Sequence, residues 1–240
     1  MNKYALALMP AMLLAAPALA AVTIYGIPAE VGATWTTTYD ARPGNSDTVV
    51  LPGVTAQVKF TLDDILNSGT TWRITAEVDN TSPSGTTRLG AFGFNTDPNL
   101  QSVAFFDKGD FGRILSDPNL NFSGGVKLEF CVNSNDVNNC TGGGNDGFLP
   151  GDALATTTFD LTFAGAAPDS VFFDNFYVRW QVLPSTPSSG LGRLTGWTGT
   201  DGDGDPLGVP EPSSWAMLIA GFGLVGAVSR RRKASLTVAA

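Results

Sequence analysis

The sequence predicts an all-β fold, a jelly-roll-like antiparallel β-sandwich, from two observations. Apolar and polar residues alternate from Val54 to Leu62, from Trp72 to Val78 and from Val126 to Val132. A period of two residues is typical of a strand with one buried and one solvated face. Turn signals separate the strand windows, at Asn67–Gly69, Ser82–Gly85 and Asp117–Asn119. Such strands form sandwiches or closed barrels. We favour the sandwich, although the pattern does not decide between the two.

Weaker strand candidates complete the predicted sheet. Only Leu62–Leu66 indicates a helix, with Asp63 as its N-cap. Trp72 and Trp180 alternate with polar neighbours, which favours core positions for both rings. The weaker strands lie at 22–27, 34–39, 88–94, 103–106, 157–163 and 171–182.

The first 20 residues have the pattern of a secretory signal peptide. Lys3 supplies a basic start, Ala5–Ala16 is apolar, and Ala18-Leu19-Ala20 is a small-x-small cleavage site. We expect cleavage between Ala20 and Ala21. The chain therefore has the Sec translocon and signal peptidase as expected partners.

Residues 209–240 carry three elements in a fixed order. Pro210, Glu211 and Pro212 come first, and an uncharged run from Trp215 to Ser229 follows. As a helix, Ser213–Ser229 would span roughly 25 Å, slightly less than the ~30 Å hydrocarbon core. We expect a single transmembrane helix within the segment 209–233, which the basic cluster ends, followed by a cytoplasmic tail, 234–240. The positive-inside bias places the charges after the run in the cytoplasm and the body outside. These charges are the basic cluster Arg230, Arg231, Arg232 and Lys233.

This order of motif, apolar run and basic cluster resembles the PEP-CTERM sorting signal of Gram-negative bacteria, which an exosortase reads. An ordinary C-terminal anchor and a short buried helix are the alternatives. The resemblance implies that the inner membrane anchors the chain transiently, with the ectodomain in the periplasm. Exosortase processing would then deliver the protein to the cell surface or extracellular matrix, where exopolysaccharide is a further candidate partner.

Between the two ends lies one predicted domain, 21–183, followed by a Pro-, Ser-, Gly- and Asp-containing segment, 184–208, that we interpret as a flexible stalk. Lys3 and the basic cluster account for five of the 14 Lys and Arg, and Glu211 for one of the 22 acids. The body therefore keeps 9 cations and 21 acids, a net charge of −12. This charge argues against nucleic acid as a partner.

Parts of the body resemble an ectodomain known among PEP-CTERM proteins as the cistern family. Asn80-Thr81-Ser82, the run Arg88–Pro98 and the strand Phe176–Gln181 carry the resemblance. Cys131, Cys140 and the following Gly142–Gly144 extend it. The resemblance implies no biochemical activity.

The two cysteines, with eight residues between them, predict a disulfide in an exported chain. Phe130 and Val132 occupy the apolar face of the strand, so we expect Cys131 on its wet face and the bridge to Cys140 at the surface.

The chain contains no His, which removes Ser-His-Asp and Cys-His catalysis and His-ligated zinc. Carboxylates remain, but they lie mostly beside Gly, Asn and Pro in expected turns; the clusters Asp63-Asp64 and Asp107–Asp110 are the exceptions. We therefore expect that the protein is not an enzyme. Asp201, Asp203 and Asp205 match the first positions of a calcium loop, but Pro206 stands where the loop needs Gly. We therefore favour a hydrated acidic linker and expect no cofactor, with Ca²⁺ binding as the alternative.

Two function classes follow. The first is a structural or adhesive surface protein sorted by its tail. The second is a carbohydrate-binding or carbohydrate-active module delivered in the same way, which would need aligned rings in solvent. Trp35 and Tyr39 are the decisive candidates for such rings, together with Trp72 and Trp180.

Overall fold

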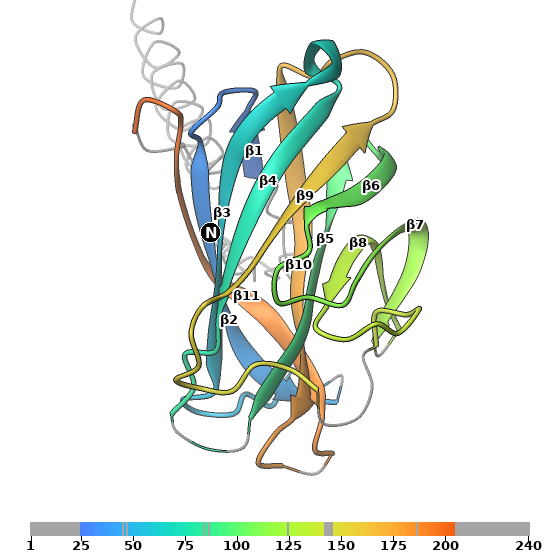
Figure 1. Ribbon diagram of the computed structural model, residues 1–240. Coiled ribbons are helices and arrows are strands. Elements are labelled where there is room, and N and C mark those ends of the chain that lie inside the picture. Colours follow the sequence, from blue (N-terminus) through green and yellow to red (C-terminus); the bar gives the residue numbers. More distant parts are fainter. Residues whose placement is uncertain are drawn as a thin grey trace, which may run out of the picture.

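A computed structural model describes residues 25–204, apart from 45, 47, 84, 86, 124, 142–145 and 186. Eleven antiparallel strands form one sheet, and the only helical element among the described residues is a 3₁₀ turn, η1, at Asn67–Gly69 (Figure 1). The predicted all-β antiparallel class is confirmed. The strands are β1 (Tyr25–Pro28), β2 (Thr34–Pro43), β3 (Thr55–Leu66), β4 (Thr71–Asp79), β5 (Arg88–Asp97), β6 (Leu100–Asp107), β7 (Arg113–Ser123), β8 (Val126–Asn133), β9 (Ala155–Phe163), β10 (Ser170–Val182) and β11 (Gly190–Thr200).

The sheet is continuous and curls until its two ends approach each other. Its order is β6-β9-β4-β3-β2-β11-β10-β5-β8-β7, and β1 pairs with β10 beside this path. The segment between β6 and β7 bridges the ends, because Asp110 N–H donates to Thr156 O of β9 and Gly112 N–H donates to Asn133 O of β8. One rolled, barrel-like sheet therefore stands where we predicted a sandwich of two separate sheets.

Aromatic rings fill the inside of the roll. Phe60 of β3 stacks on Trp35 of β2, with ring centroids 5.2 Å apart, and meets Phe94 of β5 edge-on at 5.9 Å. Phe94 continues the contact to Phe130 of β8 at 4.5 Å and to Phe173 of β10 at 5.2 Å. Figure 1 shows the strands that supply these rings surrounding one interior. The alternation in the sequence thus marks the inward face correctly.

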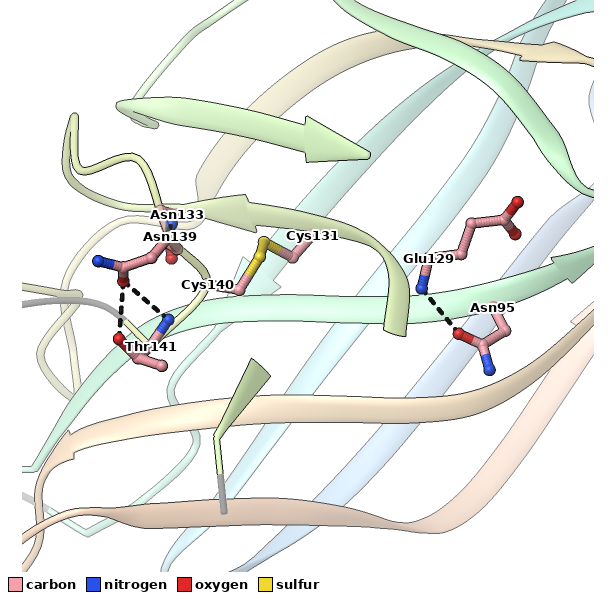
Figure 2. The surroundings of a disulfide bond; sticks show 7 residues. All are labelled: Asn95, Glu129, Cys131, Asn133, Asn139, Cys140 and Thr141. Atoms are coloured by element: carbon pink, nitrogen blue, oxygen red, sulfur yellow. Dashed lines mark hydrogen bonds between the residues drawn. A yellow bond between two sulfur atoms is a disulfide. The ribbon is translucent and has the colours of Figure 1, made fainter. Parts of the chain in front are cut away.

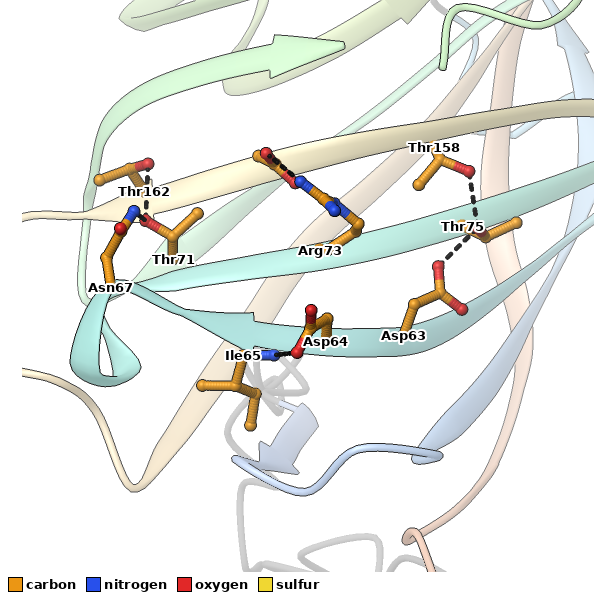
Figure 3. Close-up of polar contacts among 10 residues, drawn as sticks. Asp63, Asp64, Ile65, Asn67, Thr71, Arg73, Thr75, Thr158 and Thr162 are labelled. Atoms are coloured by element: carbon orange, nitrogen blue, oxygen red, sulfur yellow. Dashed lines mark hydrogen bonds and ion pairs between the residues drawn. The ribbon is translucent and has the colours of Figure 1, made fainter. Parts of the chain in front are cut away.

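The expected helix at Leu62–Leu66 is wrong, because β3 continues to Leu66. Leu62 is fully buried, and a register shift against β4 follows it, between Leu62 and Asp64. This bulge interrupts the period of two, which explains why the pattern stopped resembling a strand. Asp63 caps no helix; its carboxylate accepts a hydrogen bond from the Thr75 hydroxyl at 2.6 Å (Figure 3).

The predicted flexible stalk is wrong over Gly190–Thr200, since these residues form β11, which pairs with β10 on one side and β2 on the other. Two glycines allow the close approach. A Cβ at Gly190 would lie 1.9 Å from Arg42 O, and one at Gly192 would lie 2.2 Å from Val178 Cγ2. The glycines that helped to indicate a linker are what an interior strand needs at this crowded place. The domain therefore extends well past residue 183.

Candidate functional site

The disulfide joins β8 to the loop that follows it. Cys131 is bonded to Cys140, with Cα atoms 6.2 Å apart, as the spacing predicted (Figure 2). The expected surface position is wrong, because both cysteines are buried, at 0% and 1% exposure. Outward-facing Cys131 is covered by the loop it anchors, so β8 is buried on both faces near its end. A second, small core forms there, consisting of Ala91, Phe122, Leu128, Cys131, Cys140 and Leu191.

Hydrogen bonds hold this loop in place. Asn133 Nδ2 donates to Asn139 O, and Asn139 Oδ1 accepts from both the backbone N–H and the hydroxyl of Thr141, at 3.0 and 2.7 Å (Figure 2). Arg179 Nε and Gln181 Nε2 of β10 donate to Thr141 O at 3.3 and 3.1 Å. Burial under the loop lowers the pKa of Arg179 from its ordinary value. The loop is thus part of the folded body.

Glu129 is a buried carboxylate that sequence reasoning missed, although it stands among apolar residues of a strong strand. Its Oε2 accepts from the Thr96 hydroxyl at 2.8 Å and from Thr96 N–H at 3.1 Å. Its Oε1 accepts from Leu100 N–H, and its own N–H donates to Asn95 Oδ1 at 2.9 Å (Figure 2). The carboxylate therefore ties β8 to the β5–β6 connection. The described donors to this carboxylate are two backbone N–H groups and one hydroxyl, which hold neighbouring strands together.

The outer face of β3, β4 and β9 is rich in hydroxyl groups, and its polar side chains bind one another by hydrogen bonds and ion pairs. Arg73 makes a two-pronged contact to Asp160, at 2.8 and 3.0 Å, while its guanidinium carbon lies 3.5 Å from the centre of the Phe106 ring. The hydrogen bond to Asp160 raises the pKa of Arg73. Thr75 links Asp63 to Thr158, whose hydroxyl lies 2.8 Å away (Figure 3). These polar groups satisfy one another across neighbouring strands.

The acidic clusters singled out in the sequence serve turns and strand contacts. Asp107 Oδ1 accepts from Gly109 N–H at 3.0 Å, and Asp110 Oδ2 accepts from Thr156 N–H at 2.9 Å. Asp64 Oδ1 accepts from Ile65 N–H at 2.9 Å.

A carboxylate that the sequence did not indicate, Asp174, has a pKa raised by burial and secondarily by the charge of Asp97. Hydrogen bonds from Asn95 and Asn175 oppose the rise.

Of the predicted metal ligands, the structure describes Asp201 and Asp203. Asp201 Oδ1 accepts from Asp203 N–H at 3.1 Å, and Gly204 N–H donates to Asp201 O at 3.2 Å, so the pair shapes a turn. Asp205 lies outside the described residues. Across the described ranges no group of three His, Cys, Asp or Glu side chains could hold a metal ion.

The rings considered for sugar binding lie in the core. Trp35 and Tyr39 are each 1% exposed, and Trp72 and Trp180 are fully buried. The Tyr39 hydroxyl donates to Thr37 Oγ1 at 2.9 Å inside the roll. The four rings therefore form no platform in solvent.

Several predicted features lie outside the described residues: the signal peptide with Ala20 and Ala21, the motif Pro210-Glu211-Pro212, the apolar run and the cluster Arg230–Lys233. In the part that the structure describes, no helix is long and apolar enough to cross a membrane. The predicted C-terminal span is not among those residues.

Comparison with known proteins identifies the tail. The PEP-CTERM protein-sorting motif matches residues 208–233. No curated protein and no solved structure matches the chain, and the resemblance of the body to the cistern family gains no support. The C-terminal match accordingly indicates an exported protein that is anchored transiently in the membrane and processed by an exosortase.

Proposed function

We propose that the protein is a non-enzymatic structural or adhesive component of the cell surface or extracellular matrix, delivered by exosortase sorting. The observation that carries this proposal is the sorting motif at 208–233, which begins eight residues after Thr200, the last residue of β11. A folded domain followed at once by a sorting signal is the arrangement of a passenger that is exported and then released.

The domain supports a structural role. Its interior is closed by aromatic packing, and its one disulfide anchors the loop that covers the second core. On the outer face of β3, β4 and β9, Lys59 pairs with Glu77 at 2.9 Å and Arg73 with Asp160 at 2.8 Å. Charges that are paired in this way stabilise a surface and are poorly placed for acid–base chemistry.

The alternative of a carbohydrate-binding module loses its main argument. It required Trp35 and Tyr39 side by side in solvent, and both are buried. The exposed rings Phe106 and Phe172, at 62% and 42%, lie on β6 and β10, which are not neighbours in the sheet. We therefore do not propose sugar binding.

Two variants of the tail test the proposal, in the native host, with an epitope tag in the exposed 48–50 loop. Glu211→Ala removes the only charge between Asp205 and Arg230, so membrane insertion should survive while exosortase recognition fails. Uncut protein should then accumulate in the inner membrane.

Replacing the basic cluster Arg230–Lys233 with Gln is the matched second variant. It removes the positive-inside signal and roughly 1 kcal/mol per charge of attraction to the anionic leaflet. This variant should reach the periplasm with its apolar tail attached. Normal processing and release of the Glu211→Ala protein would contradict the proposal.

A further inference from the structure

The end of the domain nearest the sorting signal is defined by β11. Thr200, the last residue of β11, pairs with Thr34, the first residue of β2. Beyond it, the chain packs against the connection between β1 and β2, where a Cβ at Gly202 would lie 2.5 Å from Val31 O. Gly32 N–H of the same connection donates to Leu62 O of β3 at 2.8 Å. The chain thus leaves the domain beside Val31.

The connection from the domain to the motif is short. Five residues lie between Gly204 and Pro210, so the chain takes six steps, and a fully extended chain advances at most ~3.5 Å per residue. Pro210 therefore lies no more than about 20 Å from Gly204. A stalk of 25 residues, as the composition suggested, would have left the domain free to turn either end toward the motif.

The opposite end of the domain is out of reach of the motif. The ten residues of β2 lead from the Val31 end to the loop that carries Val49, a distance of about 30 Å at ~3.3 Å per residue. Figure 1 shows the chain leaving at the end where β1 and β2 are joined, with the loop after β2 at the other end. The connection spans at most about 20 Å, which is less than the length of β2. An enzyme that holds the motif can therefore lie beside the Val31 end of the domain but not beside the Val49 end.

We propose that the domain end formed by 30–32 and 201–204 is the surface that meets the exosortase while the motif is bound. The partner is the extramembrane part of the membrane enzyme that reads Pro210-Glu211-Pro212. Val31 is 52% exposed at this end and offers an apolar contact. The inference rests on the proposed sorting function and adds a fixed orientation of the passenger during processing.

Two exposed valines provide a matched test. Val31 and Val49 are 52% and 51% exposed and lie at opposite ends of β2. The full chain would be expressed in its host with either Val31→p-benzoylphenylalanine or Val49→p-benzoylphenylalanine and irradiated during export. We expect several-fold more cross-linked exosortase from position 31 than from position 49. Equal yields, or a higher yield from position 49, would overturn the proposal.

Lengthening the connection separates orientation from sorting itself. A 20-residue Gly/Ser insert after Gly204 should lower the cross-link yield from position 31 several-fold, because a longer linker lowers the effective concentration of this domain end at the bound enzyme. The same insert between Ala153 and Leu154, in the loop before β9, should leave the cross-link unchanged. An unchanged cross-link with the first insert would contradict a contact set by the short connection.

The tail variant distinguishes the two possible failures. If Glu211→Ala is processed normally, the sorting function is wrong. If Glu211→Ala blocks processing while positions 31 and 49 cross-link equally, sorting stands and only the orientation is wrong.

Discussion

The main core and the small core around the disulfide differ in how the sequence builds them. The main core is made largely by inward side chains of strands whose other face is only partly buried, as in β2 and β9. The small core lies on the outer side of β8, where the loop after Cys131 returns to cover the strand. Strand alternation specifies the first kind of core directly. The second depends on a loop, so no local pattern reveals it.

Truncating the centre of the main core should have the largest effect. Phe60 is fully buried and contacts Trp35, Phe92 and Phe94. We expect Phe60→Ala to lower the free energy of unfolding by about 3–5 kcal/mol, measured by urea denaturation. Val49→Ala, at an exposed site, is the control and should change stability by no more than about 0.5 kcal/mol. A loss below about 1 kcal/mol for Phe60→Ala would show that the interior is not packed as described.

Removing the disulfide from the small core should have the next largest effect. The Cys131→Ala/Cys140→Ala double variant should lose about 2–4 kcal/mol, because the bond closes a short loop that covers buried apolar residues. In the unreduced native protein neither cysteine should react with an alkylating reagent. A double variant as stable as the parent would mean that the loop packs without the bond.

Two Glu→Gln substitutions compare a buried with an exposed carboxylate. Glu129→Gln replaces a carboxylate that accepts from three donors of the β5–β6 connection and should cost about 1.5–3 kcal/mol. Glu77→Gln breaks the exposed contact to Lys59 and should cost less than about 1 kcal/mol, and less still in high salt. Equal losses would show that Glu129 does not join β8 to this connection.

Replacing Asp174 should give the smallest change in stability, and this change should be a gain instead of a loss. Burial raises its pKa above the ordinary 3.8, so the folded state holds the proton more tightly than the unfolded state. Stability therefore falls as pH rises through the range above 3.8, and the penalty persists at neutral pH. Asp174→Asn should slightly raise the unfolding temperature at pH 7, and the difference should vanish below pH 3.8. A lower unfolding temperature at pH 7 would contradict this assignment.

The sequence predicted the strand class, the inward faces around Phe60 and Trp72, and the pairing of the cysteines, because each depends on local periodicity or simple counting. It did not predict β11, because Gly190 and Gly192 carry no side chain that could reveal alternation. The helix expected at Leu62–Leu66 was wrong because the bulge after Leu62 interrupts the period of two residues. Glu129 escaped notice because its donors come from other strands. Asp174 escaped notice because its burial is set by the fold and not by its sequence neighbours.

The most direct test of exosortase sorting is the intact mass of the protein recovered outside the inner membrane of its host. The account predicts a chain that begins at Ala21, has lost Arg230–Lys233 from its C-terminus and carries one disulfide. A recovered chain that retains Met1 or the basic cluster at its final location would contradict it.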